Sequence, residues 1–371
     1  MMIPLLLLAV VALSFANGAN DNFKGVATLA GSGAMRYRAA LAWATITTLA
    51  GSLTAVFLAG TLLKSFSGRG LVPNELVESL PYVASVAMGA GGTVLLATWL
   101  GLPISTTHGL VGALVGAGWA AGAEVNFANL GTAFLLPLLL SPVVAIVATS
   151  LCYLVLHGLR RSLGVSAETC FCVGRETVEV VPLLGASLAL VKVDELTISM
   201  GTQVTCRTRY QGRLLGIDVS SVVDALHMLS AGIVSFARGL NDTPKIAALL
   251  LLAPFLSGLG ATALVGVVMA IGGVLGAKRV AEVMSQKITL MNHGQGFTAN
   301  LLTGVLVIGA SVAGWPVSTT HVSCGALFGI GAVTGQAQLR TILGILLAWV
   351  TTLPMGALVG GLSYLAIRGM V

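Results

Sequence analysis

The sequence contains few charged residues. Only 9% of its 371 residues are Asp, Glu, Lys or Arg, whereas 56% are hydrophobic. Globular domains usually carry about 25% charged residues, so this composition excludes an ordinary soluble fold. The formal net charge of +6 comes from Lys and Arg between the apolar stretches, and it does not indicate binding to nucleic acid.

Charge is absent altogether from six long windows. These are residues 39–63, 79–123, 125–159, 246–277, 288–339 and 341–367. A helix that crosses a bilayer needs about 20 mostly apolar residues, and every window reaches that length. The apolar residues do not alternate with polar ones, which excludes a transmembrane β-barrel. The sequence therefore predicts an all-α polytopic membrane protein.

The first residues lack the features of a cleaved signal peptide. Residues 1–15 have no positive charge ahead of the apolar stretch and no clear cleavage site with small residues. We therefore expect the first membrane helix here.

The five cysteines lack the spacing of a zinc site. Cys170, Cys172 and Cys206 fall in one polar segment without a double CxxC pattern, so reduced thiols without a role are the favoured interpretation. The same segment lacks a nucleophile–base pair and a phosphate loop. We expect no enzyme activity and no cofactor.

Two polar motifs occur twice, in the same order. The segment "SFANGANDNFKGVA" (14–27) recurs as "SFARGLNDTPKIAA" (235–248) at an offset of 221 residues. The segment "LPISTTHGLVGALVGAG" (102–118) recurs as "WPVSTTHVSCGALFGIG" (315–331) at an offset of 213. Such duplication predicts two related halves.

A segment of different composition separates the halves. Residues 158–218 hold 13 of the 32 charged residues, and "TVEVV", "LVKVDELTI" and "VTCRTRY" suggest short strands. We predict an N-terminal transmembrane repeat at 1–157, a cytoplasmic linker module with some β structure at 158–218, and a C-terminal transmembrane repeat at 219–371.

The basic residues predict the orientation of the crossings. The positive-inside tendency places the following residues in the cytoplasm: Arg36, Arg38, Arg160, Arg161, Lys278, Arg279, Lys287 and Arg340. Windows 79–123 and 288–339 must then enter and return, and each half crosses an odd number of times, so the repeats are inverted. Many secondary transporters hold substrate between such repeats. We expect a multi-pass protein of the plasma membrane, the inner membrane of a bacterial cell, with both termini outside.

A repeated pattern of amide, acid and lysine ends the first apolar run of each half. Asn20 and Asp21 precede Lys24, and Asn241 and Asp242 precede Lys245. Ionisable residues inside a membrane are costly and are functional candidates by default. The alternative for Asp21 is that the helix ends there and Asn20 and Asp21 cap the next segment. The second copy, in a different loop context, argues against that alternative.

Prolines interrupt two of the charge-free windows. Pro103 and Pro316 lack an N–H and disfavour helix in the preceding residue, so Ser-Thr-Thr begins a new half-helix. Helix N-termini favour anions, and two such ends would form one oxyanion site. The predicted ligands are Ser105, Thr106, Thr107, Ser318, Thr319 and Thr320. The alternative is that these hydroxyls only cap kinked helices.

Other polar residues are weaker candidates. For His108 and His321, satisfaction by a neighbouring carbonyl is favoured over a proton relay. Several residues have no clear counterpart in the first half, and a gate or a solvated helix end suits them as well as a ligand role: Arg238, Asp224, His227, Asn292, His293, Gly294 and Gln295.

Together, the "GAND" segment, its copy "GLNDTPK" and the two P-[IV]-S-T-T-H motifs resemble the inorganic phosphate transporter (PiT) family. The resemblance covers both membrane halves and implies cation-coupled symport of phosphate, with H⁺ or Na⁺ as the ion in bacterial members. It also implies that Asp21 and Asp242, beside Asn20 and Asn241, serve transport by binding or coupling the cation, and that the hydroxyl clusters bind phosphate.

This sequence departs from the family pattern at three positions. Lys24 and Lys245 stand where many members have small or amide residues, and Asn300 stands where an acid is expected. These departures leave the coupling ion and the stoichiometry open. We predict import of phosphate by symport with Na⁺ or H⁺, by alternating access around a midplane site. A permease for sulfate or another oxyanion is the alternative, and a homodimer is left open.

Overall fold

The computed structural model describes residues 2–166, 169–178, 193–202, 214–253 and 256–370. The chain divides into two compact units, one made of residues 1–153 and 227–371, the other of residues 154–226. The first unit is a helical bundle, and it contains all of the residues predicted to bind phosphate or the cation.

Helices make up both halves of the chain. The first half consists of α1 (Met2–Asp21), η1 (Lys24–Val26), α2 (Ala27–Gly31), α3 (Tyr37–Leu58), α4 (Gly60–Ser65), α5 (Asn74–Val77), α6 (Leu80–Trp99), α7 (Thr106–Ala120), α8 (Phe127–Asn129), η2 (Leu130–Leu135) and α9 (Leu136–Ser162). The second half consists of α11 (Val219–Ala247), η3 (Ala248–Leu250), α12 (Gly258–Gly276), α13 (Lys278–Glu282), η4 (Val283–Lys287), α14 (His293–Val312), α15 (Thr319–Thr334) and α16 (Leu339–Arg368).

Seven helical segments among the described residues are long and apolar enough to cross a membrane. They are Met2–Gly31, Tyr37–Leu58, Leu80–Trp99, Phe127–Ser162, Gly258–Gly276, His293–Val312 and Leu339–Arg368. The prediction of a polytopic helical membrane protein is confirmed.

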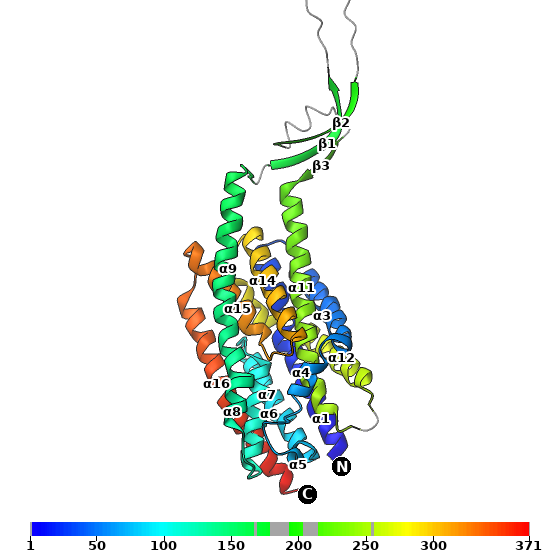
Figure 1. Ribbon diagram of the computed structural model, residues 1–371, viewed down its shortest axis with the longest axis vertical. Coiled ribbons are helices and arrows are strands. Elements are labelled where there is room, and N and C mark those ends of the chain that lie inside the picture. The colour runs from blue at the N-terminus through cyan, green and yellow to red at the C-terminus, as the bar shows by residue number, and fades with distance from the viewer. Residues whose placement is uncertain (1, 167–168, 179–192, 203–213, 254–255, 371) are drawn as a thin grey trace, which may run out of the picture. The chain divides into compact units, whose positions relative to one another are not determined.

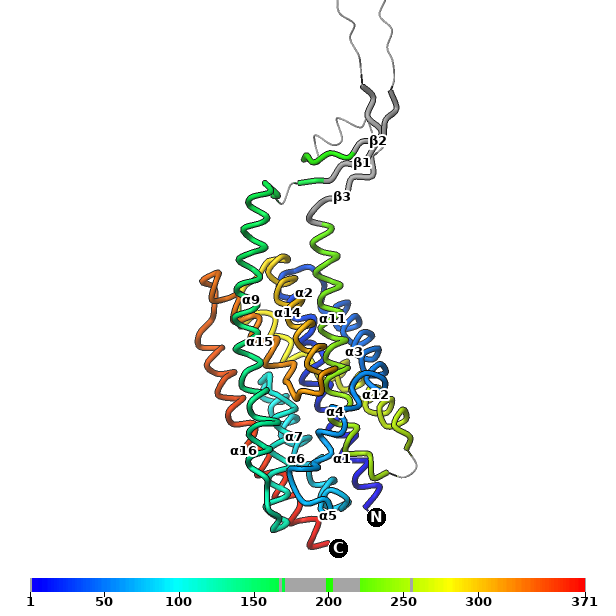
Figure 2. Tube along the Cα trace, in the orientation of Figure 1, coloured from blue at the N-terminus to red at the C-terminus, as the bar shows by residue number. Residues whose placement is uncertain are grey.

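The two halves have inverted directions in the bundle. Helix α1 begins, and helix α11 ends, at the end of the bundle where α16 also ends (Figures 1 and 2). Leu6 near the start of α1 accordingly shares a buried cluster with Leu250, which follows α11. The predicted inverted repeats are therefore present, with α1, α3, α6, α7 and α9 corresponding to α11, α12, α14, α15 and α16.

Glycines let the first helix of each half pack against the second helix of the other half. A Cβ on Gly18 would lie 2.0 Å from the carbonyl oxygen of Met269, and a Cβ on Gly239 would lie 2.1 Å from that of Thr48. Both pairs are related by the offset of 221 residues. Small residues permit such close backbone contact between membrane helices.

The last helix of each half packs against the broken helix of the other half. A Cβ on Gly112 of α7 would lie 2.1 Å from the carbonyl oxygen of Leu353 in α16. Its counterpart Gly325 of α15 faces Pro142 of α9, at 2.7 Å. Because each broken helix is held by the other half, α7 and α15 are brought together.

The second unit contains a small antiparallel sheet. Strands β1 (Thr169–Val178), β2 (Val193–Thr202) and β3 (Leu214–Asp218) form it in the order β2-β1-β3, with Cys170 opposite both Gly201 and Asp218. The predicted β structure is thus present, although β1 begins earlier than "TVEVV". The predicted strand "VTCRTRY" (204–210) and Cys206 lie outside the described residues, and Cys170 is buried.

Candidate functional site

Two helix breaks lie at the predicted prolines. Helix α6 ends at Trp99 before α7 begins, and α14 ends at Val312 before α15 begins. Ser105 and Ser318 are the N-caps of α7 and α15, and their hydroxyls accept hydrogen bonds from the backbone N–H groups three residues on, at 3.1 and 3.3 Å. The capping role weighed from the sequence is therefore what these two serine hydroxyls perform.

The threonines that follow the caps lie in a buried polar cluster. Thr106 donates a hydrogen bond to Asp21 Oδ2 (3.0 Å), and Thr319 accepts one from Asn241 Nδ2 (3.1 Å). Neither threonine is more than 4% exposed. The breaks thus bring the hydroxyls of α7 and α15 next to the charged motifs that end α1 and α11.

Lys24 reaches from the first half into the second. Its Nζ donates to Asn20 Oδ1 (2.8 Å), to the carbonyl oxygen of Ile104 (2.8 Å) and to Thr320 Oγ1 (2.7 Å), and it forms an ion pair with Asp21. The ammonium is therefore surrounded by four oxygen atoms at the first break.

Lys245 repeats this arrangement with the halves exchanged. Its Nζ donates to Thr107 Oγ1 (2.8 Å) and to the carbonyl oxygen of Val317 (2.7 Å), and it lies 3.5 Å from Asp242 Oδ1. The same nitrogen lies 5.5 Å from the ring centroid of Phe66. Each lysine thus contacts a threonine of the opposite half.

The two motif asparagines hold the broken backbone. Asn20 donates to the carbonyl oxygen of Leu102 (3.1 Å) and accepts from the N–H of Ile104 (3.3 Å), while Asn241 donates to the carbonyl oxygen of Val317 (3.2 Å). Backbone at membrane depth needs such internal partners wherever it leaves the helix. These amides therefore support the breaks at which Lys24 and Lys245 lie.

Arg238 and Asn17 belong to the same cluster; Arg238 was a weaker candidate from the sequence, and Asn17 was missed. Arg238 is fully buried; its guanidinium donates to Asn17 Oδ1 (2.6 Å) and Asn22 Oδ1 (3.0 Å), and its Nε lies 3.9 Å from Asp242 Oδ2. The sequence left Arg238 open between a gate, a solvated helix end and a ligand role, and its full burial excludes the solvated helix end. The offset of 221 pairs it with Asn17, a residue of a different type.

The two motif histidines meet behind the breaks. The rings of His108 and His321 lie 4.5 Å apart in an edge-to-face arrangement, and His321 stacks on Trp349 at 3.9 Å. His321 Nδ1 lies 3.3 Å from the carbonyl oxygen of Leu138, and Trp349 Nε1 donates to that of Pro103 (3.2 Å). For His321, the carbonyl contact favoured from the sequence is present.

Gln295 and Asn300 contact a different group of residues. Asn300 Nδ2 donates to Thr28 Oγ1 (2.8 Å), which also lies 3.0 Å from His227 Nε2. Gln295 donates to the hydroxyl of Tyr153 (3.3 Å) and completes the capping box of α14. These hydrogen bonds tie Asn300 to α2 and Gln295 to α9, and not to the two breaks.

The charged groups at the breaks are closed off from solvent. Three cationic side chains and two carboxylates gather there, and all are at most 4% exposed: Lys24, Arg238, Lys245, Asp21 and Asp242. Buried charges require close partners of opposite sign, and each of these has one. These five side chains together carry one positive formal charge in excess, which suits an anion.

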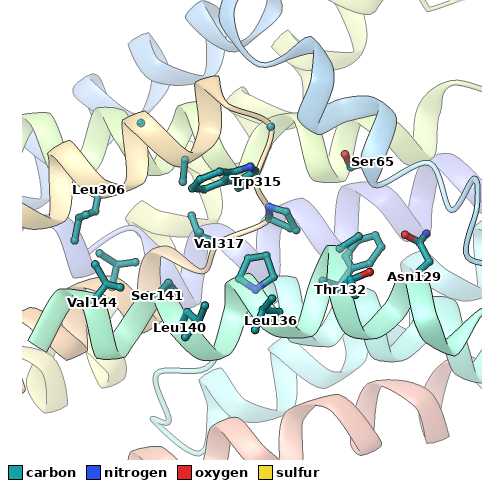
Figure 3. A pocket seen from close by; sticks show the side chains of 18 of the residues that line it. Ser65, Asn129, Thr132, Leu136, Leu140, Ser141, Val144, Leu306, Trp315 and Val317 are labelled. Atoms are coloured by element: carbon teal, nitrogen blue, oxygen red, sulfur yellow. The ribbon is translucent and has the colours of Figure 1, made fainter.

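A pocket of about 910 Å³ borders the second break from another side (Figure 3). Its lining is mainly apolar, and it includes Leu140 and Val144 of α9, Leu306 of α14, and Trp315 and Val317 of the connection to α15. An oxyanion needs hydrogen-bond donors or positive charge. The pocket lining holds one cationic side chain, Arg69, whereas the buried cluster holds three.

Comparison with known proteins agrees with this geometry. A family model described as "Phosphate transporter family" matches residues 17–360. A protein of Rhizobium meliloti named "Probable low-affinity inorganic phosphate transporter" is 28% identical to this chain. The alignment covers 98% of this chain and 96% of that protein. A Bacillus subtilis protein of the same name is 25% identical, and the alignment covers 97% of this chain and 95% of that protein.

A solved structure named "The sodium-dependent phosphate transporter" has the same fold. It aligns over 100% of both chains with a TM-score of 0.75 and 20% sequence identity. The seven apolar helices and the named relatives make it a multi-pass membrane transporter of phosphate and not an enzyme. Because the family model spans nearly the whole membrane region, this chain belongs to the phosphate transporter family.

Proposed function

We propose that the chain imports inorganic phosphate by symport with a cation, Na⁺ or H⁺, through alternating access. The observation that carries this proposal is the meeting of two capped helix N-termini, α7 and α15, in a closed cluster of net positive charge. The name of the solved structure with the same fold, which includes "sodium-dependent", supports cation coupling.

Phosphate is proposed to bind between the two breaks, at Ser105–Thr107 and Ser318–Thr320. The free N–H groups of the first turn and the helix dipoles of α7 and α15 attract an anion there. The serine hydroxyls already serve as caps, so the direct side-chain ligands are the four threonines. Thr107 and Thr320 accept hydrogen bonds from Lys245 and Lys24 in this structure. A phosphate bound between the two threonines would accept hydrogen bonds from both lysines.

Cation coupling is proposed to reside at Asp21 and Asp242, supported by Asn20 and Asn241. A carboxylate that takes up Na⁺ or a proton loses its negative charge beside the incoming anion. The loaded site then carries less net charge through the membrane, where isolated charge is costly. Coupling follows because a doubly charged phosphate alone leaves the site with one excess negative charge, which one bound Na⁺ or proton balances.

Transport requires the closed site to open to each side in turn. We propose that the inverted halves rock about the two breaks, because related halves have two equivalent arrangements. The orientation proposed from the basic residues puts the central module in the cytoplasm and both termini outside, in the plasma membrane. Assembly as a homodimer is part of this proposal and is tested by the mass of the purified protein.

Uptake by purified protein in liposomes tests the proposal. Radiolabelled phosphate and sulfate are each offered under an inward Na⁺ gradient, an inward H⁺ gradient, or no gradient. We expect phosphate to accumulate under at least one cation gradient and sulfate not to accumulate. Phosphate flux that ignores both gradients would instead support a passive anion channel, and equal uptake of sulfate would support the alternative oxyanion permease.

A further inference from the structure

We infer that the ammonium groups of Lys24 and Lys245 are resident cations of the phosphate site, so that transport by this chain needs no Na⁺. This inference rests on the proposed phosphate symport and narrows it, since the proton is then the ion left to couple. Four lines of structural evidence support it: the oxygen shell of Lys24, its repetition at Lys245, the charge balance, and the burial of both side chains.

The first line is the surroundings of the Lys24 ammonium. Four oxygens of four kinds contact it: an amide of Asn20, a carboxylate of Asp21, the carbonyl of Ile104 and the hydroxyl of Thr320. An ammonium has only three hydrogens to donate, one fewer than the oxygens present. Carboxylate, carbonyl, amide and similar oxygens are the ligands that hard metal cations take in proteins. The lysine nitrogen thus fills a position that would suit a small bound cation.

The second line is repetition under the inverted symmetry. The Lys245 ammonium contacts the atoms that the inverted symmetry relates to those around Lys24. They are the hydroxyl of Thr107, the carbonyl of Val317 and the carboxylate of Asp242. Thr107 corresponds to Thr320, and Val317 to Ile104, at the offset of 213. Both equivalent positions beside the site are therefore filled by a tethered positive charge.

The third line is the charge balance. With both lysines, the three cations at the breaks exceed the carboxylates by one, and a singly charged phosphate makes the site neutral. Without the lysines, Arg238 alone would face Asp21 and Asp242, and phosphate would enter a site already negative. Such a site requires added cations, because uncompensated buried charge is strongly unfavourable. The lysines supply that compensation covalently.

The fourth line is burial. Lys24 is 3% exposed and Lys245 is 1% exposed, so neither ammonium reaches solvent as a snorkelling side chain does. The spacing of three residues from each aspartate turns the side chain back along its own helical segment towards the carboxylate. A pairing that served only the local fold would not direct each lysine to a threonine of the opposite half.

The first experiment uses the wild-type protein in liposomes. Phosphate uptake is driven by an inward H⁺ gradient in Na⁺-free choline buffer, and the measurement is repeated with an added inward Na⁺ gradient. We expect the same initial rate in both buffers. Uptake that requires Na⁺ would overturn this inference and leave the proposed symport standing, whereas no uptake under any gradient would contradict the proposed symport itself.

The second experiment vacates the cation positions. Lys24→Ser and Lys245→Ser should each lower Na⁺-free uptake on the order of 100-fold, because Asp21 loses its ion-pair partner and Asp242 keeps only Arg238. Na⁺ at about ten times its Kd should then raise the rate by about tenfold, because Na⁺ enters the vacated oxygen shell. Uptake by either variant that Na⁺ does not stimulate would overturn the inference.

Two control variants separate this effect from general damage. Lys64→Ser removes an exposed lysine outside the cluster and should leave both the rate and its independence of Na⁺ unchanged. The double variant Lys24→Ser with Asp21→Asn removes the cation and its carboxylate together. It should show no stimulation by Na⁺, and stimulation in that variant would contradict the assignment of Asp21 as the ligand of the vacated position.

Discussion

At the scale of single residues, the charged side chains of the site link the two halves of the chain. Lys24 contacts Thr320, and Arg238 contacts Asn17, across sequence separations of more than two hundred residues. Because these contacts are buried and charged, removal of one partner leaves the other without compensation. Substitutions here are therefore expected to alter both transport and stability.

Neutral substitution of the carboxylates tests their role in transport. Asp21→Asn and Asp242→Asn keep the side-chain shape but remove the charge that Lys24, Lys245 and Arg238 face. We expect each to lower the initial rate of phosphate uptake on the order of 100-fold, because a buried cation loses its partner. Glu75→Gln in an exposed helix is the matched control. Wild-type rates in both aspartate variants would remove these residues from the mechanism.

Removal of the buried guanidinium should mainly affect stability. Arg238→Gln deletes the hydrogen bonds to Asn17 and Asn22 and leaves Asp242 with one cation fewer. We expect a loss of about 3–5 kcal/mol, the usual cost of breaking a buried ion pair. Thermal unfolding of the detergent-solubilised protein measures it, with exposed Arg38→Gln as the control. An unchanged unfolding temperature would show that Arg238 does not tie the halves together.

At the scale of helices, close backbone packing fixes the position of the two breaks. Gly116 of α7 lies so near α16 that a Cβ there would be 1.9 Å from the carbonyl oxygen of Ala357. Its counterpart Gly329 of α15 packs in the same way against Ile146 of α9, at 2.6 Å. The helices that carry the threonines therefore depend on glycine for their place in the bundle.

A pair of glycine substitutions tests this dependence. Gly116→Ala forces α7 away from α16, and we expect it to destabilise the protein by about 1–3 kcal/mol, as overpacking usually does. Gly344 lies within α16, and a Cβ there would have no neighbouring atom within 4 Å. Gly344→Ala should therefore stabilise the protein by up to about 1 kcal/mol through helix propensity. Unfolding temperatures compare the two. Equal shifts would contradict the close packing.

The helix breaks could be predicted from the sequence, whereas the packing partners could not. Pro103 and Pro316 act through their own backbone, so local rules place the starts of α7 and α15 correctly. Gly112 and Gly325 each pack against a helix of the opposite half. A run of small residues predicts close helix packing but does not indicate which helix is the partner. Asn17 was missed because the residue at the equivalent position, Arg238, is of a different type, so the repeat does not mark the pair as a shared motif.

At the scale of the whole molecule, inverted symmetry gives the site two equivalent sides. The positions of the basic residues predict which side is cytoplasmic. Cysteine labelling tests this orientation in a variant whose native cysteines are replaced. A membrane-impermeant maleimide should label Lys64→Cys in intact cells and Lys278→Cys only after lysis, because both positions are exposed and the proposed orientation puts them on opposite sides of the membrane. The reverse pattern would overturn the orientation.

The central claim is that phosphate binds between the breaks before α7 and α15. Arsenate has the shape and charge of phosphate, and its arsenic atom can be located by anomalous X-ray scattering. The account predicts one anomalous peak within hydrogen-bond distance of Thr106, Thr107, Thr319 and Thr320, with both lysine ammonium groups beside it. A peak only elsewhere, for example near exposed Arg69 in the pocket beside α4, would contradict the account.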